Sequence, residues 1–312
     1  MRLASTVVIS GDAGSGKSTV VYSILLMQAI ARGMARIEAY GNGDAALVSS
    51  QQALPCELAL DFDCEGATYQ YGLRLVYDVF AGRWRIGGEW LRAGGMVIMT
   101  RTGSHVVISG VDGGSYELDQ SSFVLATFVS QDQAHPLVKA HSYLAGLFVF
   151  LPEPVLFDDG YDSRQSYPYL ASGGQNLGAW MLSFLSNRMS AYPELSKLLV
   201  RYLPGFQRIV SKADATGRNR VYLMMAVGGR FYEVPLMLVS KAQKLIVLAC
   251  LMTVIGELYP SIVCIWDDFD QLERVSKSLA DGLCATLACQ GQLIMTSHAN
   301  YGLMAQRNIT LP

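Results

Sequence analysis

The sequence has little charge, and neither sign is in clear excess. Only 16% of its 312 residues are Asp, Glu, Lys or Arg, whereas 51% are hydrophobic. An average globular chain carries about 25% charge, so this chain can bury a large core and is not mainly disordered. It has 24 basic and 26 acidic residues, for a net charge of -2. The overall charge therefore gives no attraction to nucleic acid or to an anionic membrane.

The sequence also lacks a long hydrophobic run. The longest, Leu245–Gly256, is shorter than the ~20 residues that a membrane-spanning helix needs. The run Ser142–Phe157 is interrupted by two prolines and a glutamate. We expect both runs to be buried core segments. Residues Met1–Thr6 lead directly into a predicted strand and show no signal-peptide pattern, which favours a cytoplasmic protein without membrane contact.

Cysteine pairs are missing as well. None of the six cysteines lies in a C-x-x-C pair or at a spacing typical of metal ligands. Most of them lie in apolar segments, so we expect buried, reduced thiols. The six are Cys56, Cys64, Cys250, Cys264, Cys284 and Cys289.

Predicted strands and helices alternate at both ends of the chain, which favours an α/β fold with a largely parallel core sheet. The strand Val7–Ile9 precedes a helix from Ser18 to Arg32. Further strands are expected at 221–227, 231–234, 262–266 and 292–296, and helices at 177–187, 193–203, 240–258 and 275–289. Helical spacing also extends from 121 to 150, and 214–219 is a polar loop. Alternating polarity at 57–63, 68–75, 96–99 and 105–108 predicts an inserted antiparallel β lobe.

Residues 11–18 read G-D-A-G-S-G-K-S and match the phosphate-loop pattern G-x-x-x-x-G-K-[ST] between a strand and a helix. Its glycines let backbone N–H groups surround phosphates, and the helix N-terminus favours negative charge. We expect Lys17 to reach the β- and γ-phosphates and the Ser18 hydroxyl to bind Mg²⁺. The alternative is a glycine-rich turn without a ligand. The predicted nucleotide contacts here are Gly11, Asp12, Ala13, Gly14, Ser15, Gly16, Lys17, Ser18 and Thr19.

The apolar strand Ile262–Trp266 ends in two carboxylates, Asp267 and Asp268. We expect Asp267 to bind the metal, directly or through water, and Asp268 to face the attacking water. The alternative is a solvated acidic turn. A later apolar strand ends at His298, where a γ-phosphate sensor would lie, although a lone histidine is more often structural. The long separation of Lys17 from Asp267 favours an ATPase with a large insertion over a small-molecule phosphotransferase.

In this order the motifs resemble the ABC-type ATPases of the SMC and RecF-like group. Compact bacterial ATPases with an AAA domain and the ATPase half of OLD-family proteins are similar over nearly the whole chain. Local likenesses are Tyr69–Tyr71 with Glu89–Leu91, Leu170–Leu177, Pro204–Phe206 and Thr296–His298. The resemblance implies a P-loop NTPase with an ABC-type core sheet, an inserted antiparallel β lobe and a helical lobe.

The resemblance further implies a single ATPase domain over 1–312. Its parts are the phosphate-loop strand and helix (1–50), the β lobe (51–120), a helical segment (121–220) and the signature-like helix with two core strands (221–312).

The segment Val239–Lys244 occupies the place of the ABC signature, which usually reads L-S-G-G-Q. Ser240 and Gln243 remain and are the implied contacts to a nucleotide held by a second subunit. Lys241 and Ala242 replace the two glycines.

The catalytic residues implied by the resemblance are Lys17, Asp268 and His298, with Ser18 and Asp267 at the metal. Asp268 stands where glutamate is usual, and the Q-loop glutamine has no clear counterpart, with Gln131 as a guess. These departures favour nucleotide binding over fast turnover.

The resemblance thus implies a slow ATPase that uses ATP and Mg²⁺ as a nucleotide-gated switch. Two copies would enclose two ATP molecules and separate after hydrolysis. The implied partners are a nuclease or toxin protein in antiphage defence, or DNA ends, although the net charge does not favour DNA. The alternative is a regulatory subunit that binds nucleotide without hydrolysing it and works through protein–protein interaction.

Overall fold

The computed structural model describes residues 6–40, 55–110, 113–158, 160–161, 165, 167–213, 218–259, 261–298 and 307–310. The chain forms two compact units. One comprises Met1–Lys17 with Phe148–Pro312, and the other is Ser18–Leu147. We call them the core-sheet unit and the β-lobe unit.

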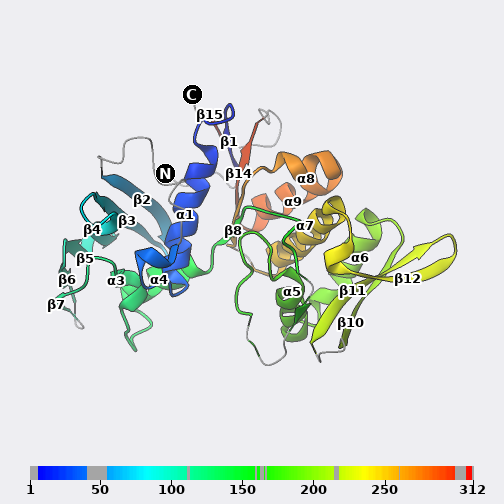
Figure 1. The fold of residues 1–312 in the computed structure, drawn as a ribbon, viewed down its shortest axis with the longest axis horizontal. Helices are drawn as coiled ribbons and strands as arrows, with labels where there is room; N and C mark the ends of the chain where they lie inside the picture. The colour runs from blue at the N-terminus through cyan, green and yellow to red at the C-terminus, as the bar shows by residue number, and fades with distance from the viewer. Residues whose placement is uncertain are drawn as a thin grey trace. The chain divides into compact units, whose positions relative to one another are not determined.

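The core-sheet unit is built on five parallel strands in the order β15-β1-β14-β13-β8 (Figure 1). Every residue of β1 is buried, as continuous apolar strands in parallel sheets usually are. The strands are β1 (Thr6–Ser10), β8 (Phe148–Phe150), β13 (Val263–Trp266), β14 (Gln292–Ser297) and β15 (Arg307–Thr310). The parallel core sheet predicted from the alternation of elements is confirmed.

Helix α7 (Lys241–Leu258) lies at the centre of this unit. Its side chains from Lys244 to Gly256 are buried all round, which explains why its sequence has no polar face. The apolar run Leu245–Gly256 is therefore core, as predicted. The other helices of the unit are α5 (Leu177–Asn187), α6 (Ala191–Tyr202), α8 (Asp270–Val275), α9 (Lys277–Gln290) and the short η2 (Leu236–Leu238).

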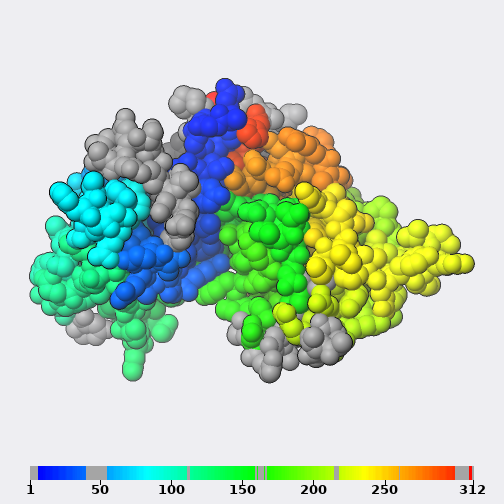
Figure 2. Space-filling model, in the orientation of Figure 1, coloured from blue at the N-terminus to red at the C-terminus, as the bar shows by residue number. Residues whose placement is uncertain are grey.

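A second, antiparallel sheet belongs to the same unit. Its strands are β9 (Gly160–Tyr161), β10 (Phe206–Ala213), β11 (Asn219–Val227) and β12 (Arg230–Pro235), with β11 in the middle. Strand β11 alternates between buried and less buried residues, so one face packs on the core. The β11–β12 hairpin, yellow in Figure 2, extends beyond the rest of the unit.

The β-lobe unit is a six-stranded antiparallel meander in sequence order. Its strands are β2 (Cys56–Cys64), β3 (Ala67–Asp78), β4 (Arg83–Ala93), β5 (Met96–Thr102), β6 (His105–Ile108) and β7 (Gly114–Glu117). Gly72 on β3 is required by packing, because a Cβ there would lie 2.1 Å from the ring of Trp90 on β4. The inserted antiparallel lobe is confirmed. The unit also contains α1 (Lys17–Ala31, from its second residue), η1 (Ile37–Tyr40), α3 (Val124–Thr127) and α4 (Pro136–Ala145).

The prediction of helical structure from 121 to 150 is wrong in part. Only α3 and α4 form there, and Phe148–Phe150 is strand β8 of the core sheet. A short apolar run suits either a buried helix or a buried strand, so its periodicity could not decide. The polar loop at 214–219 falls mostly outside the described residues, and Asn219 already belongs to β11. The subdivision of 1–312 at residues 50, 120 and 220 stays a prediction.

No helix among the described residues is long and apolar enough to cross a membrane.

Candidate nucleotide site

The predicted phosphate loop leaves the carboxyl end of β1 and leads into α1. Gly14 and Gly16 have φ of 86° and 92°, in the left-handed region that favours glycine. A Cβ at either position would meet nothing within 4 Å. The backbone conformation, rather than a lack of space, therefore requires glycine at these two positions.

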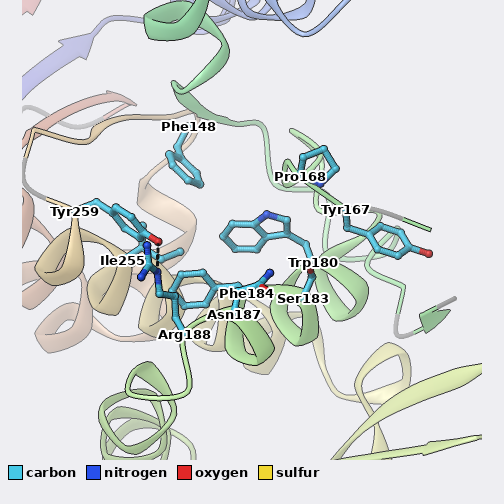
Figure 3. Close-up of a pocket in the computed structure, with 10 residues that line it drawn as sticks. All are labelled: Phe148, Tyr167, Pro168, Trp180, Ser183, Phe184, Asn187, Arg188, Ile255 and Tyr259. Carbon is cyan, nitrogen blue, oxygen red and sulfur yellow. Dashed lines mark hydrogen bonds between the residues drawn. The ribbon is translucent and has the colours of Figure 1, made fainter. Parts of the chain in front are cut away.

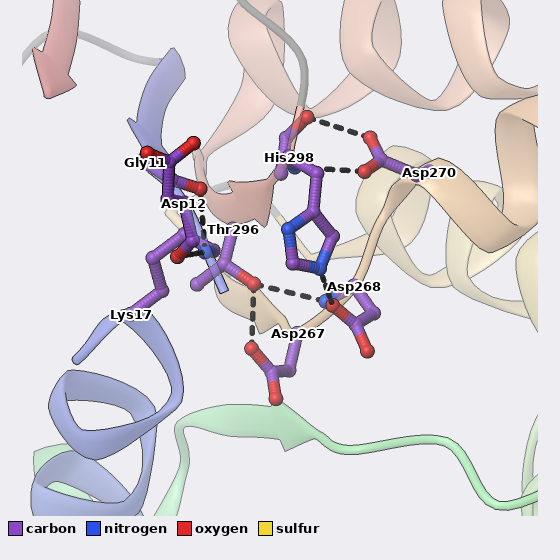
Figure 4. A network of polar contacts seen from close by, with 9 residues as sticks. Gly11, Asp12, Lys17, Asp267, Asp268, Asp270, Thr296 and His298 are labelled. Carbon is purple, nitrogen blue, oxygen red and sulfur yellow. Dashed lines mark hydrogen bonds and ion pairs between the residues drawn. The ribbon is translucent and has the colours of Figure 1, made fainter. Parts of the chain in front are cut away.

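Lys17 lies across this loop. Its side chain is buried, and the Nζ atom donates to the carbonyl oxygens of Gly11 and Asp12, both at 2.7 Å (Figure 4). An ammonium group has three N–H donors, so one is left for a phosphate oxygen. The Ser15 hydroxyl is buried in the same loop without a partner among the described residues. Buried polar atoms are normally paired, so an orphaned donor here fits an anionic ligand.

The remaining loop residues are more open. Asp12, Ala13, Gly14 and Thr19 are exposed, whereas Gly11, Gly16 and Ser18 are half-buried. Ser18 directly follows Lys17 in the first turn of α1.

Thr296 on β14 connects the two predicted carboxylates at the end of β13. Its hydroxyl donates to Oδ1 of Asp267 at 2.5 Å and accepts from the N–H of Asp268 at 2.9 Å. Asp267 is only 7% exposed, which excludes a solvated acidic turn at this position. Thr296 thus orients Asp267 and fixes the backbone of Asp268.

Asp268 and His298 come together across the ends of neighbouring strands. The Asp268 Oδ1 atom lies 3.6 Å from Nε2 of His298, and both side chains are about half exposed. Asp268 has a φ of 51°, which non-glycine residues seldom adopt. Asp and Asn tolerate this left-handed conformation better than other side chains do, so the fold favours Asp over Glu here.

Asp270, at the start of α8, was not predicted as a site residue. Its Oδ1 accepts from the Ser297 hydroxyl at 2.6 Å, and its Oδ2 accepts from the His298 N–H at 2.8 Å. The side chain is 7% exposed. Asp270 therefore holds the end of β14 and the backbone of the predicted phosphate sensor. The third acid of the sequence D-D-F-D was the signal that could have indicated it.

The two halves of the site lie one strand apart. Because β14 separates β1 from β13, the strand that precedes Lys17 is about 10 Å from the one that precedes Asp267. Ligands of open α/β sheets bind outside the carboxyl ends of the strands, where both halves lie. This separation leaves room for phosphates between the lysine and the carboxylate.

Among the described residues no three His, Cys, Asp or Glu side chains are grouped to hold a metal ion. The two predicted protein ligands, Ser18 and Asp267, fit Mg²⁺, which usually takes one or two protein ligands and fills its shell with phosphate oxygens and water. They do not fit a structural zinc site.

The cysteines have no part in the site. Cys250, Cys264 and Cys284 are buried free thiols, as predicted, but Cys289 is exposed and Cys56 and Cys64 are half-buried. Burial raises the pKa of Cys250 and of Cys284 to about 12, which suppresses the reactive thiolate.

Ser240 and Gln243 form a capping box at the N-terminus of α7. The Ser240 Oγ accepts from the Gln243 N–H at 3.2 Å, and the Gln243 Oε1 accepts from the Ser240 N–H at 2.9 Å. The pattern S-x-x-Q before an apolar run indicates such a box. Both residues thus have a local structural role beside the one implied by the resemblance. Gln131, the candidate for the Q-loop glutamine, is an exposed residue between α3 and α4, and its assignment stays a prediction.

The strand, loop and helix around Gly11–Ser18, with an acid pair at the same sheet edge, define the class: a P-loop fold. More particularly, the chain has the ABC-type fold of an SMC head domain. A solved SMC head bound to the C-winged helix domain of ScpA matches with a TM-score of 0.51 and 13% identity, over 95% of this chain and 83% of that one.

Two further solved structures are more distant. The SMC head domain from Thermotoga maritima has a TM-score of 0.36 and 14% identity, over 94% of this chain and 80% of that chain. The SMC head with an extended coiled coil, bound to the C-terminal domain of ScpA derived from Pyrococcus furiosus, has a TM-score of 0.42 and 12% identity, over 95% and 84%. Protein-family models and curated proteins yield no match to the sequence.

Proposed function

We propose that the protein binds ATP with Mg²⁺ and hydrolyses it slowly. One observation carries this proposal: the phosphate loop with its buried Lys17 and the carboxylates of Asp267 and Asp268 lie at the same edge of the sheet, one strand apart. A glycine-rich turn alone would not need an acid pair at that edge.

Each side chain then has a definite task. Lys17 donates its remaining N–H to the β- and γ-phosphates, and the loop N–H groups surround them. Ser18 and Asp267 hold Mg²⁺, which neutralises negative charge on the phosphates when bound. Asp268 orients the attacking water, and His298, held beside it by Asp270, contacts the γ-phosphate.

The slow rate follows from Asp268. A general base must come within about 2.6–3.2 Å of the water that it activates. Aspartate is one methylene shorter than the glutamate usual in the similar ATPases, and a misplacement near 1 Å costs on the order of 100-fold in rate. The left-handed backbone of Asp268 explains why the shorter acid stands there.

We further propose that ATP links two copies of the chain. The N-terminus of α7 would then meet the γ-phosphate bound by a second copy through the Ser240 hydroxyl, whose proton the capping box does not use. A similar solved SMC head is bound to the C-winged helix domain of ScpA, so we extend the proposal to a protein partner. In its most specific form, the proposal is that this partner is a nuclease or toxin that acts in antiphage defence or DNA-end processing in the cytoplasm.

The second candidate is a regulatory subunit that binds ATP without hydrolysing it. The geometry of Asp268 favours it, as does the use of the Gln243 side chain in the helix cap. In that case ATP is a structural ligand, and the work of the protein is protein–protein interaction.

The test is the change Lys17→Ala, with Lys197→Ala as a matched control, because Lys197 is an exposed lysine on α6. ATP with Mg²⁺ at 100 times its Kd should stabilise the wild type by about 2.7 kcal/mol, seen as a higher Tm. Lys17→Ala should lose this shift while keeping the circular dichroism spectrum of the folded protein, and Lys197→Ala should retain it. Equal shifts in all three proteins would show that ATP does not bind at this loop.

A further inference from the structure

The core-sheet unit contains a pocket away from the phosphate loop. It lies beside Phe148, the first residue of β8, and therefore at the amino edge of the parallel sheet, opposite the phosphate loop. Its volume is about 640 Å³, and it opens to solvent. Small-molecule sites usually measure about 300–1,000 Å³, so the pocket is large enough for a ligand of that class.

One face of α5 is devoted to this pocket. Trp180, Ser183, Phe184, Asn187 and Arg188 all line it, at helical spacings of three and four residues. A face with two aromatic rings would normally pack against another element. Here it faces the cavity, with α7 on the other side (Figure 3).

The aromatic rings form an ordered wall. Phe148 and Trp180 meet edge to face, with ring centroids 6.0 Å apart, and Trp180 and Phe184 are stacked with centroids 5.7 Å apart. Trp180 is anchored, at 6% exposure, whereas Phe148 and Phe184 are only half-buried. Such a wall offers flat apolar surface to another ring, since aromatic groups prefer stacked or edge-to-face contacts.

A positive charge, that of Arg188, lies at one end of the wall. The Arg188 Nε donates to the Tyr259 hydroxyl at 3.0 Å, and its guanidinium carbon lies 5.7 Å from the Tyr259 ring centroid. Tyr259 thereby fixes the guanidinium, whose two terminal nitrogens have no hydrogen-bond partner in the described part of the chain. None of the described residues that line the pocket is acidic. The guanidinium is thus oriented and available for an anion.

We propose that this pocket binds a small anion that carries a flat aromatic ring, such as an aromatic carboxylate. The ring lies against Trp180 and its aromatic neighbours, and the carboxylate accepts two parallel hydrogen bonds from Arg188. Ser183 and Asn187 supply further polar contacts from the same helix face. This site is separate from the nucleotide site and does not depend on the function proposed above.

The experiment measures binding by saturation-transfer NMR with three probes: indole-3-acetate, tryptamine and acetate. Indole-3-acetate has both ring and anion, tryptamine has the ring with a positive charge, and acetate has the anion alone. We expect saturable binding of indole-3-acetate, in the micromolar to millimolar range, and at least tenfold weaker binding of the other two. No saturable binding, or equal binding of tryptamine, would overturn the proposal.

Three variants locate the binding on the full-length protein. Arg188→Gln removes the charge and should weaken the binding of indole-3-acetate about tenfold or more. Ser183→Trp places a bulky ring on the α5 face where the ligand ring would lie and should weaken binding strongly. Arg201→Gln is the matched control, because Arg201 lies over a tyrosine ring in the same way but outside the pocket. If Arg188→Gln and Arg201→Gln both bind as the wild type does, the anion is not held at this site.

Discussion

At the scale of single residues, the site depends on hydrogen bonds between chain segments that are far apart in sequence. Thr296 bonds to both acids after β13, and Asp270 bonds to both residues at the end of β14. These bonds connect residues 27 to 29 positions apart. Together they hold the predicted metal ligand, the predicted base and the predicted phosphate sensor on one rigid edge.

Asp270→Ala should destabilise the protein by about 2–5 kcal/mol, because it removes the acceptor of the buried Ser297 hydroxyl and of the half-buried His298 N–H. Asp270→Asn should cost less than about 1 kcal/mol, because an amide can accept from the N–H and donate to the hydroxyl. Urea unfolding measures both changes. If Asp270→Ala unfolds at the wild-type urea concentration, the two hydrogen bonds have no part in stability.

Asp268→Asn should abolish ATP turnover without lowering stability, because Asn tolerates the same left-handed backbone. Asp268→Glu should raise turnover by moving the carboxylate toward the water, at a stability cost of about 1 kcal/mol for the backbone. His298→Ala should lower turnover with ATP affinity little changed. Phosphate release at saturating ATP, with melting curves, measures all three.

Two results would contradict the assignment of Asp268 as the general base of a slow ATPase. A wild-type rate of tens per second would contradict the argument from side-chain length. A wild type without turnover, together with an Asp268→Asn protein that is still biologically active, would favour the non-hydrolysing regulator.

The phosphate loop and Asp267 could be predicted because their geometry is local. The phosphate loop needs only its own glycines and the flanking strand and helix, and Asp267 needs only the apolar strand before it. Asp270 and Thr296 act through the pairing of β13 with β14, where Trp266 is opposite Met295. A sequence pattern does not contain that register, so their tasks could not be predicted.

At the scale of elements, prediction succeeded where an apolar segment was long enough to form a helix of three turns or more. The helix at 177–187 was predicted with its observed bounds, and α7 begins one residue after its predicted start. Strands β7, β8, β9 and β15 have two to four residues each, too few for a period to be recognised. They form because neighbouring strands offer hydrogen bonds, which is tertiary information.

Two variants of Ser240, at the N-terminus of α7, test whether this residue acts only as a helix cap or also contacts the nucleotide of a second copy. Ser240→Ala removes the cap, which should cost about 1 kcal/mol of stability, and it also removes the hydroxyl proposed to contact the γ-phosphate, so it should weaken ATP-linked association. Ser240→Arg loses the same cap and adds a bulky charge, so it should block association while each subunit still binds ATP.

Light scattering with and without ATP and Mg²⁺ measures this association, on the wild type and both variants. A wild-type mass that ATP does not change would contradict the dimer proposal. If both variants lose stability equally and associate as the wild type does, Ser240 serves only as a helix cap.

At the scale of the whole molecule, each unit contributes its own polar interior to stability. In the β-lobe unit, the fully buried Glu89 accepts hydrogen bonds from the Tyr71 hydroxyl at 3.0 Å and from the N–H groups of Val124 and Leu125 at 2.8 and 3.0 Å. One carboxylate thus connects β3, β4 and the start of α3. Removing an acceptor from this network leaves buried donors without partners.

This network predicts how stability depends on pH. Burial raises the pKa of Glu89 above its ordinary value of 4.5, and the hydrogen bonds and Arg101 only partly oppose this. The folded protein therefore holds the Glu89 proton at a pH where the unfolded chain has lost it. This contribution to the free energy of unfolding is fully present below pH 4.5 and is lost as the pH rises through the raised pKa.

Glu89→Gln isolates this contribution, because Gln does not titrate. Other carboxylates, such as Asp78 and Asp119, have lowered pKa values and act in the opposite sense, but they are present in both proteins and cancel in the difference. The substitution should also lower the free energy of unfolding by about 1–3 kcal/mol, since the amide nitrogen of Gln cannot accept from a backbone N–H. Urea unfolding across this pH range should therefore show the wild type more stable, by a margin that shrinks as the pH rises above 4.5. A margin that grows with pH would mean that the fold lowers the pKa of Glu89, and that its ionised form, not its proton, stabilises the β-lobe unit.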